Sequence, residues 1–221
     1  MASIPDMTTR TKVKPRIRKP GSMKALEELG RVRLSANFFF RDFLMSEIAN
    51  FYGRPNIPAD PERAIATGRA LCQTLLEPLQ ATFGRLAVRS GYRSAEVCAF
   101  GNARGHGAGV KMNAGYHIWD LLDRKGRPGA AACIVIPWFA DRYAAGADWR
   151  ALAWWIHDHL PYAHLQFYPK LCAFNILWRE GPERGIESFI APRGCLTRNG
   201  MANFDGDHSA WYQGFPELRK A

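Results

Sequence analysis

The sequence lacks several features that would assign a chain to a special class. It contains no apolar run of membrane-spanning length and no CxxC pair, and its five cysteines are scattered. An odd, scattered set of cysteines indicates free thiols rather than a disulfide framework. The first residues also lack the charged-then-apolar layout of a secretory signal. We therefore expect no transmembrane segment, and a protein that is made in the cytoplasm and acts elsewhere only after release.

Acidic residues are scarce relative to basic ones. The chain has 20 Asp and Glu against 30 Lys and Arg, which gives a formal net charge of +10. This balance favours anionic partners such as nucleic acid, anionic lipid or cell-wall polymers. Nucleic-acid binding would need basic residues gathered on one face with interleaved aromatics. Beyond the N-terminal arm the basic residues are dispersed along the chain, so we expect no specific nucleic-acid partner.

Length and composition predict one folded domain with a loose arm. The 221 residues are 47% hydrophobic and 12% aromatic, enough for a substantial core. Residues 1–21 are basic and rich in Pro, Ser and Thr without an apolar period, which predicts a disordered arm. Residues 22–221 then form a single domain. Within it, 179–221 is expected to be a loop-rich extension because the stretch from Pro192 has strong turn chemistry and little periodicity.

Two helices carry clear start signals. Asp60 can cap a helix over 61–83, Pro61 suits its first position and Gly84 ends it. A second helix is expected over 148–159, with Asp148 as its cap. Leucines recur every fourth residue in the first helix, which predicts a stripe that packs on the core.

Apolar alternation predicts the strands. The segments 86–89, 130–137, 162–168 and 173–178 have strand patterns, and the last two are spaced as a hairpin. The first leads into Ser90-Gly91-Tyr92-Arg93-Ser94, where glycine permits a turn and Arg93 follows a rigid edge. An arginine held there suits a carboxylate or an oxyanion.

An ordered series of short motifs runs over roughly residues 34–168. The motifs are Ser35-Ala36-Asn37-Phe38, Leu76-Glu77-Pro78-Leu79, Ser90 to Ser94, His117, Gly129-Ala130-Ala131-Ala132-Cys133-Ile134 and His164-Leu165-Gln166-Phe167. The order of the motifs is more specific than any one of them. The series resembles the zinc D-alanyl-D-alanine peptidases, which share a structural class with lysostaphin and the hedgehog signalling domain, and it is most similar to the branch that includes phage endolysins.

The resemblance implies an α+β domain with a small antiparallel sheet flanked by helices, like that of the hedgehog domain and the D-alanyl-D-alanine peptidases. It also implies a bound Zn²⁺ and hydrolysis of amide bonds in peptidoglycan peptide stems. His117, Cys133 and His164 stand at the positions of the family's metal ligands. Arg93 matches the family arginine that contacts the substrate carbonyl or carboxylate. Two neutral imidazoles and one anion would leave a fourth zinc position for water, whose pKa falls toward neutrality.

The metal motif departs from the family at its third ligand. The family pattern is His-x-x-Gly-x-Ala-x-Asp, whereas this chain has Cys133 at the aspartate position and an insertion at roughly 119–127. A thiolate is also a good zinc ligand. Asp120 or Asp123 is the alternative third ligand, in which case Cys133 is an ordinary core thiol.

The general base also departs from the family pattern. The usual Glu-x-x-His spacing is absent because position 161 is proline. Asp158 and His159 are the nearest candidates, and Asp158 is the one we assign as base. The alternative is that both merely end the preceding helix, where a histidine suits the negative end of the dipole. His106 could line the cleft, whereas His157 and His208 are expected to be surface or structural residues.

These residues predict a zinc-dependent metallopeptidase, an endolysin-like cell-wall hydrolase encoded by a phage or prophage. It would act at the bacterial cell wall after release, or be carried in a virion. The alternative is a catalytically degenerate protein of the same fold that binds the cell wall or forms part of a virion. The substituted aspartate, the insertion and the missing Glu-x-x-His favour this alternative. The bond that is cut, carboxypeptidase against endopeptidase action, and the oligomeric state stay open.

Overall fold

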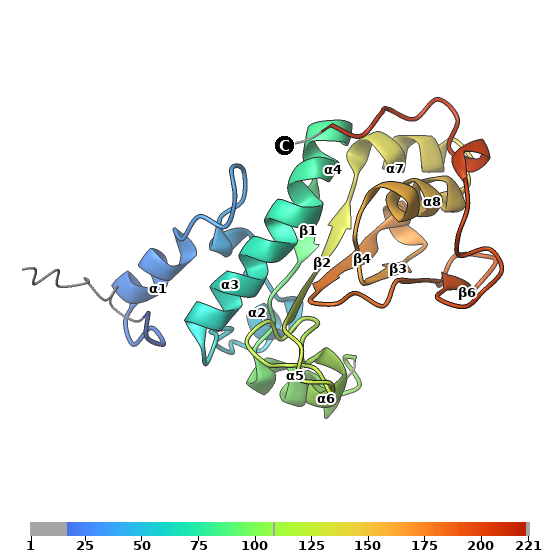
Figure 1. Cartoon of the computed structure of the whole chain (residues 1–221). Helices are drawn as coiled ribbons and strands as arrows, with labels where there is room; N and C mark the ends of the chain where they lie inside the picture. The colour runs from blue at the N-terminus through green and yellow to red at the C-terminus, as the bar shows by residue number, and fades with distance from the viewer. Residues whose placement is uncertain (1–16, 108, 220–221) are drawn as a thin grey trace, which may run out of the picture.

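A computed structural model describes residues 17–107 and 109–219 (Figure 1). Most of the arm predicted for residues 1–21 lies outside these ranges. At the start of the described chain, the Ile17 N–H donates to Glu62 Oε1 at 2.8 Å. Among the described residues no helix combines the length and the apolar character that crossing a membrane requires.

A six-stranded sheet in the order β1-β2-β4-β3-β5-β6 forms the centre of the fold. Neighbouring strands are antiparallel except for β3 and β5, which are parallel. The predicted α+β class and the predicted hairpin, which is β3 with β4, are confirmed. The strands are β1 Ala87–Ser90, β2 Gly129–Val135, β3 His164–Phe167, β4 Phe174–Arg179, β5 Gly185–Ser188 and β6 Gly194–Arg198.

The two helices whose caps were predicted begin directly after those residues. The predicted helix over 61–83 is α3, one π-helical turn at Cys72–Leu76 and α4 in succession, and Asp60 accepts from the Arg63 N–H. Asp148 likewise caps α8. The α-helices are α1 Met23–Gly30, α2 Glu47–Phe51, α3 Pro61–Leu71, α4 Glu77–Phe83, α5 Ala95–Asn102, α6 Val110–Asn113, α7 Pro137–Ala144 and α8 Trp149–His159.

The main core lies between one face of the sheet and the helices. Leu165 and Phe167 of β3 point to this face with Ile176 of β4, and all three are fully buried. α3 and α4 run along the sheet, whereas α2, α5 and α6 gather at one end of the molecule (Figure 1). Trp119 enters the same core and approaches Gly68 so closely that a Cβ there would lie 2.7 Å from the indole. Glycine at position 68 is therefore required by packing.

The C-terminal region contains order that the sequence did not predict. β5 extends the sheet beside β3, and β6 pairs with β5. Ile186 is the only large apolar residue of β5, so the strand offers no alternating pattern to recognise. The expected loop-rich extension thus contributes two strands to the sheet, and one of them reaches the candidate site.

Candidate functional site

One face of the sheet carries polar side chains from four strands. Cys133, Asn175, Gln166 and Glu187 lie opposite one another in β2, β4, β3 and β5, so their side chains share a face. His164 stands two residues before Gln166 and points to the same side. Two tyrosines adjoin this row. We call the set the polar face: Tyr116, Cys133, His164, Gln166, Tyr168, Asn175 and Glu187.

Hydrogen bonds fix the middle of the polar face. The Tyr168 hydroxyl donates to Gln166 Oε1 at 2.6 Å, and Asn175 Nδ2 donates to the Tyr168 hydroxyl at 2.9 Å. Asn175 is buried, whereas Gln166 and Tyr168 are half-buried. The centre of the face is therefore a preorganised set of hydrogen-bonding groups that remains partly open to solvent.

His117 and Arg93 are brought together beside this face. The Arg93 N–H donates to the His117 carbonyl at 2.8 Å, and His117 Nδ1 donates to the carbonyl of Gly91 at 2.9 Å. Burial, reinforced by the Arg93 guanidinium, lowers the pKa of His117 to about 4. The imidazole is therefore neutral at pH 7 and its Nε2 carries a lone pair, as a metal ligand requires.

Tyr116 contacts both predicted histidine ligands. Its ring centroid lies 4.9 Å from that of His117 and 6.1 Å from that of His164. Its hydroxyl is 3.4 Å from His164 Nδ1. Burial raises the pKa of Tyr116, so the hydroxyl keeps its proton at neutral pH. The phenol thus occupies the region beside both imidazoles.

Glu187 is a candidate site residue that the sequence analysis missed. Its Oε2 lies 3.7 Å from His164 Nε2, and its side chain is 54% exposed. Burial lowers the pKa of His164, and the negative charge of Glu187 partly offsets that effect. Because Glu187 reaches His164 only through the parallel pairing of β5 with β3, no spacing along the sequence could have indicated it.

Cys133 is a half-buried thiol. It packs against Val135, Ala140 and Ala173. Burial raises its pKa to about 11, so it is protonated at neutral pH. A metal ion would have to remove that proton before the sulfur could bind it.

The three predicted zinc ligands do not form a metal group in this arrangement. β4 lies between β2 and β3, so Cys133 and His164 are separated by two strand spacings, roughly 10 Å. Among the described residues, His117, Cys133 and His164 do not form a set in which one ligand atom of each lies within 4.8 Å of the other two. The residues therefore do not fit a zinc ion unless Tyr116 and the strands move.

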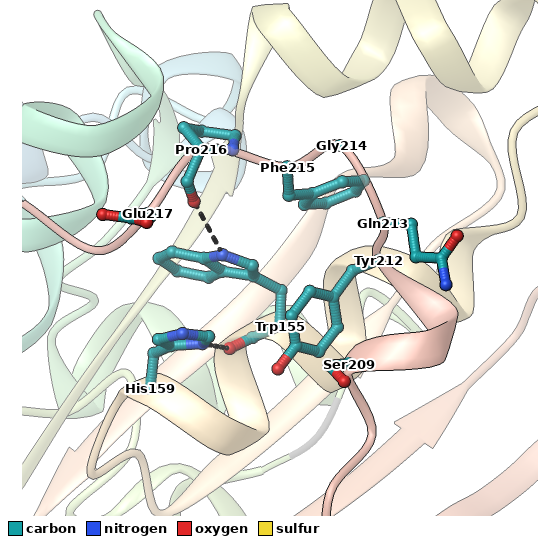
Figure 2. Close-up of a pocket in the computed structure, with 9 residues that line it drawn as sticks. All are labelled: Trp155, His159, Ser209, Tyr212, Gln213, Gly214, Phe215, Pro216 and Glu217. Carbon is teal, nitrogen blue, oxygen red and sulfur yellow. Dashed lines mark hydrogen bonds between the residues drawn. The ribbon is translucent and has the colours of Figure 1, made fainter.

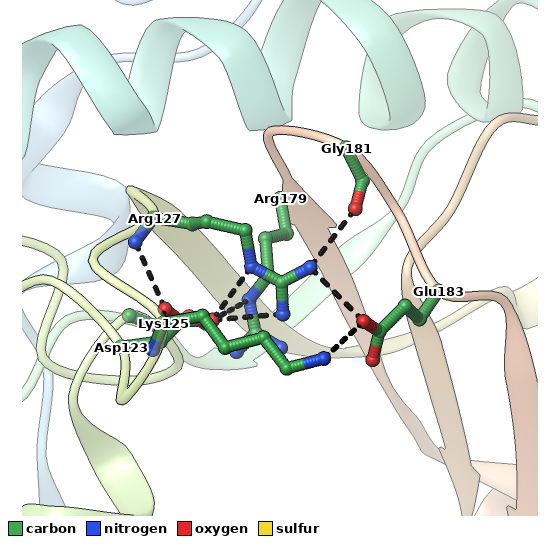
Figure 3. A network of polar contacts seen from close by, with 7 residues as sticks. Asp123, Lys125, Arg127, Arg179, Gly181 and Glu183 are labelled. Carbon is green, nitrogen blue, oxygen red and sulfur yellow. Dashed lines mark hydrogen bonds and ion pairs between the residues drawn. The ribbon is translucent and has the colours of Figure 1, made fainter.

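The alternative third ligands have structural partners. Asp120 accepts hydrogen bonds from the Ala59 and Asp60 N–H groups and from the Tyr92 hydroxyl. Asp123 accepts from Arg127 Nε at 3.0 Å and forms an ion pair with Arg179 (Figure 3).

The inserted segment is held against the end of β4. Figure 3 shows Lys125 and Arg127 meeting Glu183, while Arg179 reaches Asp123. Arg179 also donates to the Gly115 carbonyl at 3.0 Å, immediately before Tyr116. The ionic network therefore ties the insertion to the backbone that carries Tyr116, which helps to keep the phenol beside the two histidines.

Asp158, the predicted general base, binds the C-terminal segment. Its Oδ1 lies 2.7 Å from His208 Nδ1, and its Oδ2 accepts from the Tyr212 hydroxyl at 2.8 Å. His208 in turn stacks on Trp154, with centroids 3.9 Å apart and an interplanar angle of 5°. These contacts hold the carboxylate against the C-terminal segment and not against His164.

His157, Asp158 and His208 form a second polar group that could hold a metal ion, because one ligand atom of each lies within 4.8 Å of the others. Both imidazoles are buried. His157 Nε2 donates to the Phe204 carbonyl, and its Nδ1 accepts from the Tyr162 hydroxyl. Since the His208 nitrogens face Asp158 and the Asn203 carbonyl, a metal would have to displace at least one of these contacts.

His159, the other candidate base, lines a pocket of about 310 Å³ between the end of α8 and the C-terminal segment (Figure 2). Its Nδ1 donates to the Trp155 carbonyl at 2.8 Å, while the Trp155 indole donates to the Pro216 carbonyl at 3.1 Å. The ring also stacks on Trp155. His159 therefore belongs to the packing of the C-terminal segment.

Replacing Asp158 by asparagine should loosen the C-terminal segment. Removing the charge weakens, without abolishing, the bonds from His208 and Tyr212, each worth about 1.5–3 kcal/mol as a charge-assisted contact. We expect faster amide hydrogen exchange over 203–212 and a loss of about 1–2 kcal/mol in unfolding free energy. Asp205→Asn, an exposed change in the same segment, is the control. Unchanged exchange would contradict the structural role.

The chain matches no protein-family model, no curated protein and no solved structure at a significant level. The geometry of the polar face and the sequence motifs are therefore the features of this chain that point to a function.

Proposed function

We propose that this chain is a divergent, catalytically degenerate member of the zinc D-alanyl-D-alanine peptidase class, with a hedgehog-like sheet, which binds peptidoglycan stem peptides on its polar face. One observation carries the proposal. The family positions Arg93, His117, Cys133 and His164 all fall on or beside this one face, yet the ligands are spread over it and Tyr116 stands beside both histidines. Such a face retains recognition groups without a preformed metal centre.

The groups on the face suit a short peptide with free carboxylates. Gln166, Asn175 and Tyr168 offer amide and hydroxyl groups that can pair with peptide N–H and C=O groups. The Arg93 guanidinium acts electrostatically on both His117 and Tyr168, which places its charge at this face. An arginine fork binds a carboxylate through two parallel hydrogen bonds. The net charge of +10 favours an anionic wall.

The active zinc peptidase is the second candidate. The neutral His117 with its free Nε2 favours it, as does the carboxylate of Glu187 beside His164. In that case His117, Cys133 and His164 would hold the zinc after Tyr116 and the strands had moved, and the metal would supply the activated water.

Binding of a synthetic stem peptide, measured by calorimetry on the full chain, tests the proposal. Arg93→Gln should weaken binding about tenfold, since a charge-assisted contact contributes roughly 1.5–3 kcal/mol. Arg85→Gln removes the same charge from an exposed arginine just before β1 and should leave the affinity unchanged. Elemental analysis of the same protein should find no stoichiometric zinc, and digestion of peptidoglycan should release no new amino groups.

The outcomes separate the two candidates. Suppose that the protein contains stoichiometric zinc and hydrolyses stem peptides, and that His117→Ala and His164→Ala each abolish hydrolysis while the protein stays folded. That result would contradict the catalytically degenerate function and establish the peptidase. A folded protein that neither binds nor cleaves stem peptides would overturn both.

A further inference from the structure

Two guanidinium groups enclose one aromatic ring at the end of α5. The Arg54 Cζ lies 3.8 Å from the centroid of the Phe100 ring, and the Arg104 Cζ lies 3.7 Å from it. Two groups at this distance cannot share one face of a ring without overlapping, so they cover opposite faces. Cation–π attraction therefore gathers two positive charges around Phe100.

The aromatic surface continues beyond Phe100. The Tyr52 ring packs edge-on against Phe100 with centroids 5.0 Å apart, and its hydroxyl is 3.0 Å from His106 Nε2. Phe51 packs edge-on against Tyr52 at 4.8 Å and is 82% exposed. This corner thus presents three connected rings, the last of which is almost entirely open to solvent. We call Phe51, Tyr52, Arg54, Phe100, Arg104 and His106 the α2–α5 patch.

The arginines of the patch keep their hydrogen-bond donors available. Both side chains are exposed, and within residues 17–107 and 109–219 neither Arg54 nor Arg104 forms an ion pair with a carboxylate. Stacking uses the flat face of a guanidinium, while its N–H donors lie in the plane and point outward. Each arginine can therefore bind a phosphate and remain stacked on Phe100.

We propose that the α2–α5 patch binds single-stranded nucleic acid without base specificity. Basic side chains interleaved with aromatics, which are dispersed in the sequence, are gathered here by the contact of α2 with α5 (Figure 1). Exposed rings stack on bases while arginines bind the phosphates between them. A polymer that alternates flat rings with phosphates uses both features. The site goes beyond the stem-peptide function, and the α2–α5 patch shares no residue with the polar face.

Fluorescence anisotropy with a labelled oligothymidylate and the full chain tests this site. Phe51→Ala should weaken binding about fivefold or more, because each stacked base contributes roughly 1–3 kcal/mol. Because the Phe51 side chain is exposed, the alanine variant should fold normally. Phe189→Ala, a change at another exposed phenylalanine, is the control. Arg104→Gln should weaken binding and reduce the slope of log affinity against log salt by about 0.7. Arg85→Gln is its charge-matched control.

Three results would contradict the binding of single-stranded nucleic acid at the α2–α5 patch. One is unchanged oligonucleotide binding in Phe51→Ala. Another is an equal loss in Arg104→Gln and Arg85→Gln, which would show a diffuse charge effect. The third is heparin binding that depends on Phe51 as strongly as oligonucleotide binding does, which would assign the patch to anionic glycans. Phe51→Ala and Arg104→Gln change no residue of the polar face, so stem-peptide binding by these two variants tests the proposed function separately.

Discussion

Replacing Asp120 by alanine should lower the free energy of unfolding by about 3 kcal/mol. The residue is only 3% exposed and its two oxygens are both used. Oδ2 accepts from the N–H groups of Ala59 at 2.8 Å and Asp60 at 3.1 Å, and Oδ1 accepts from the Tyr92 hydroxyl at 3.1 Å. Alanine would leave these donors unpaired, including the hydroxyl of the fully buried Tyr92, and each buried donor without a partner costs about 1–3 kcal/mol.

Urea denaturation followed by tryptophan fluorescence measures this loss. Asp141→Ala is the matched control, since Asp141 is exposed on α7 and alanine is a good helix former. We expect the control to change stability by no more than about 0.5 kcal/mol. If Asp120→Ala kept full stability but lost bound zinc, Asp120 would be a metal ligand and its structural assignment would fail.

The sequence placed Asp120 near a predicted metal ligand but could not reveal its hydrogen-bond partners. It stands close after His117 in a segment of uncertain structure, so local spacing alone permitted a role as metal ligand. Its actual partners Ala59 and Asp60 are about sixty positions away, and no periodic pattern links them. Helix caps such as Asp148 were predictable because a cap bonds to an N–H only two or three residues ahead.

The distances between the predicted metal ligands also could not be predicted, because they depend on the order of the strands in the sheet. Alternation in β3 correctly predicts that His164 and Gln166 share a face, because a strand has a period of two. It does not predict which strand lies beside which. β4 comes between β2 and β3, and that one topological fact separates Cys133 from His164. The zinc site inferred from the motifs therefore stays a prediction, whereas the shared face is an observation.

Tyr116 and Glu187 were not identified as site residues from the sequence, for two different reasons. Tyr116 directly precedes His117, but only packing shows that its ring reaches His164. Glu187 lies in a strand that the sequence did not predict at all. Both depend on contacts across the sheet, and such contacts leave no trace in a single sequence. The chemistry of the polar face thus depends on Tyr116 and Glu187, which contact His164 in the folded chain, as well as on the residues of the motifs.

The metal-free protein should lose stability as the pH falls from about 6.5 to about 4. Burial, reinforced by Arg93, lowers the pKa of His117 to about 4 in the folded state, against about 6.5 in the unfolded chain. The unfolded chain therefore takes up a proton first as the pH falls, which favours unfolding. The stabilisation from this residue is complete above about pH 6.5 and is lost toward pH 4, for a total of about 3 kcal/mol.

Urea denaturation at several pH values, in the presence of a chelator, measures the slope. His157 and His164 also have pKa values lowered by burial, so they add to the loss in the same direction. The His117→Gln variant should be less stable at neutral pH, but its unfolding free energy should depend less steeply on pH. The reason is that unfolding of the variant takes up nearly one proton fewer between about pH 6.5 and pH 4. If His117→Gln kept the slope of the unmodified chain, His117 would already be protonated in the folded protein, and its assignment as a neutral imidazole with a free Nε2 would be wrong.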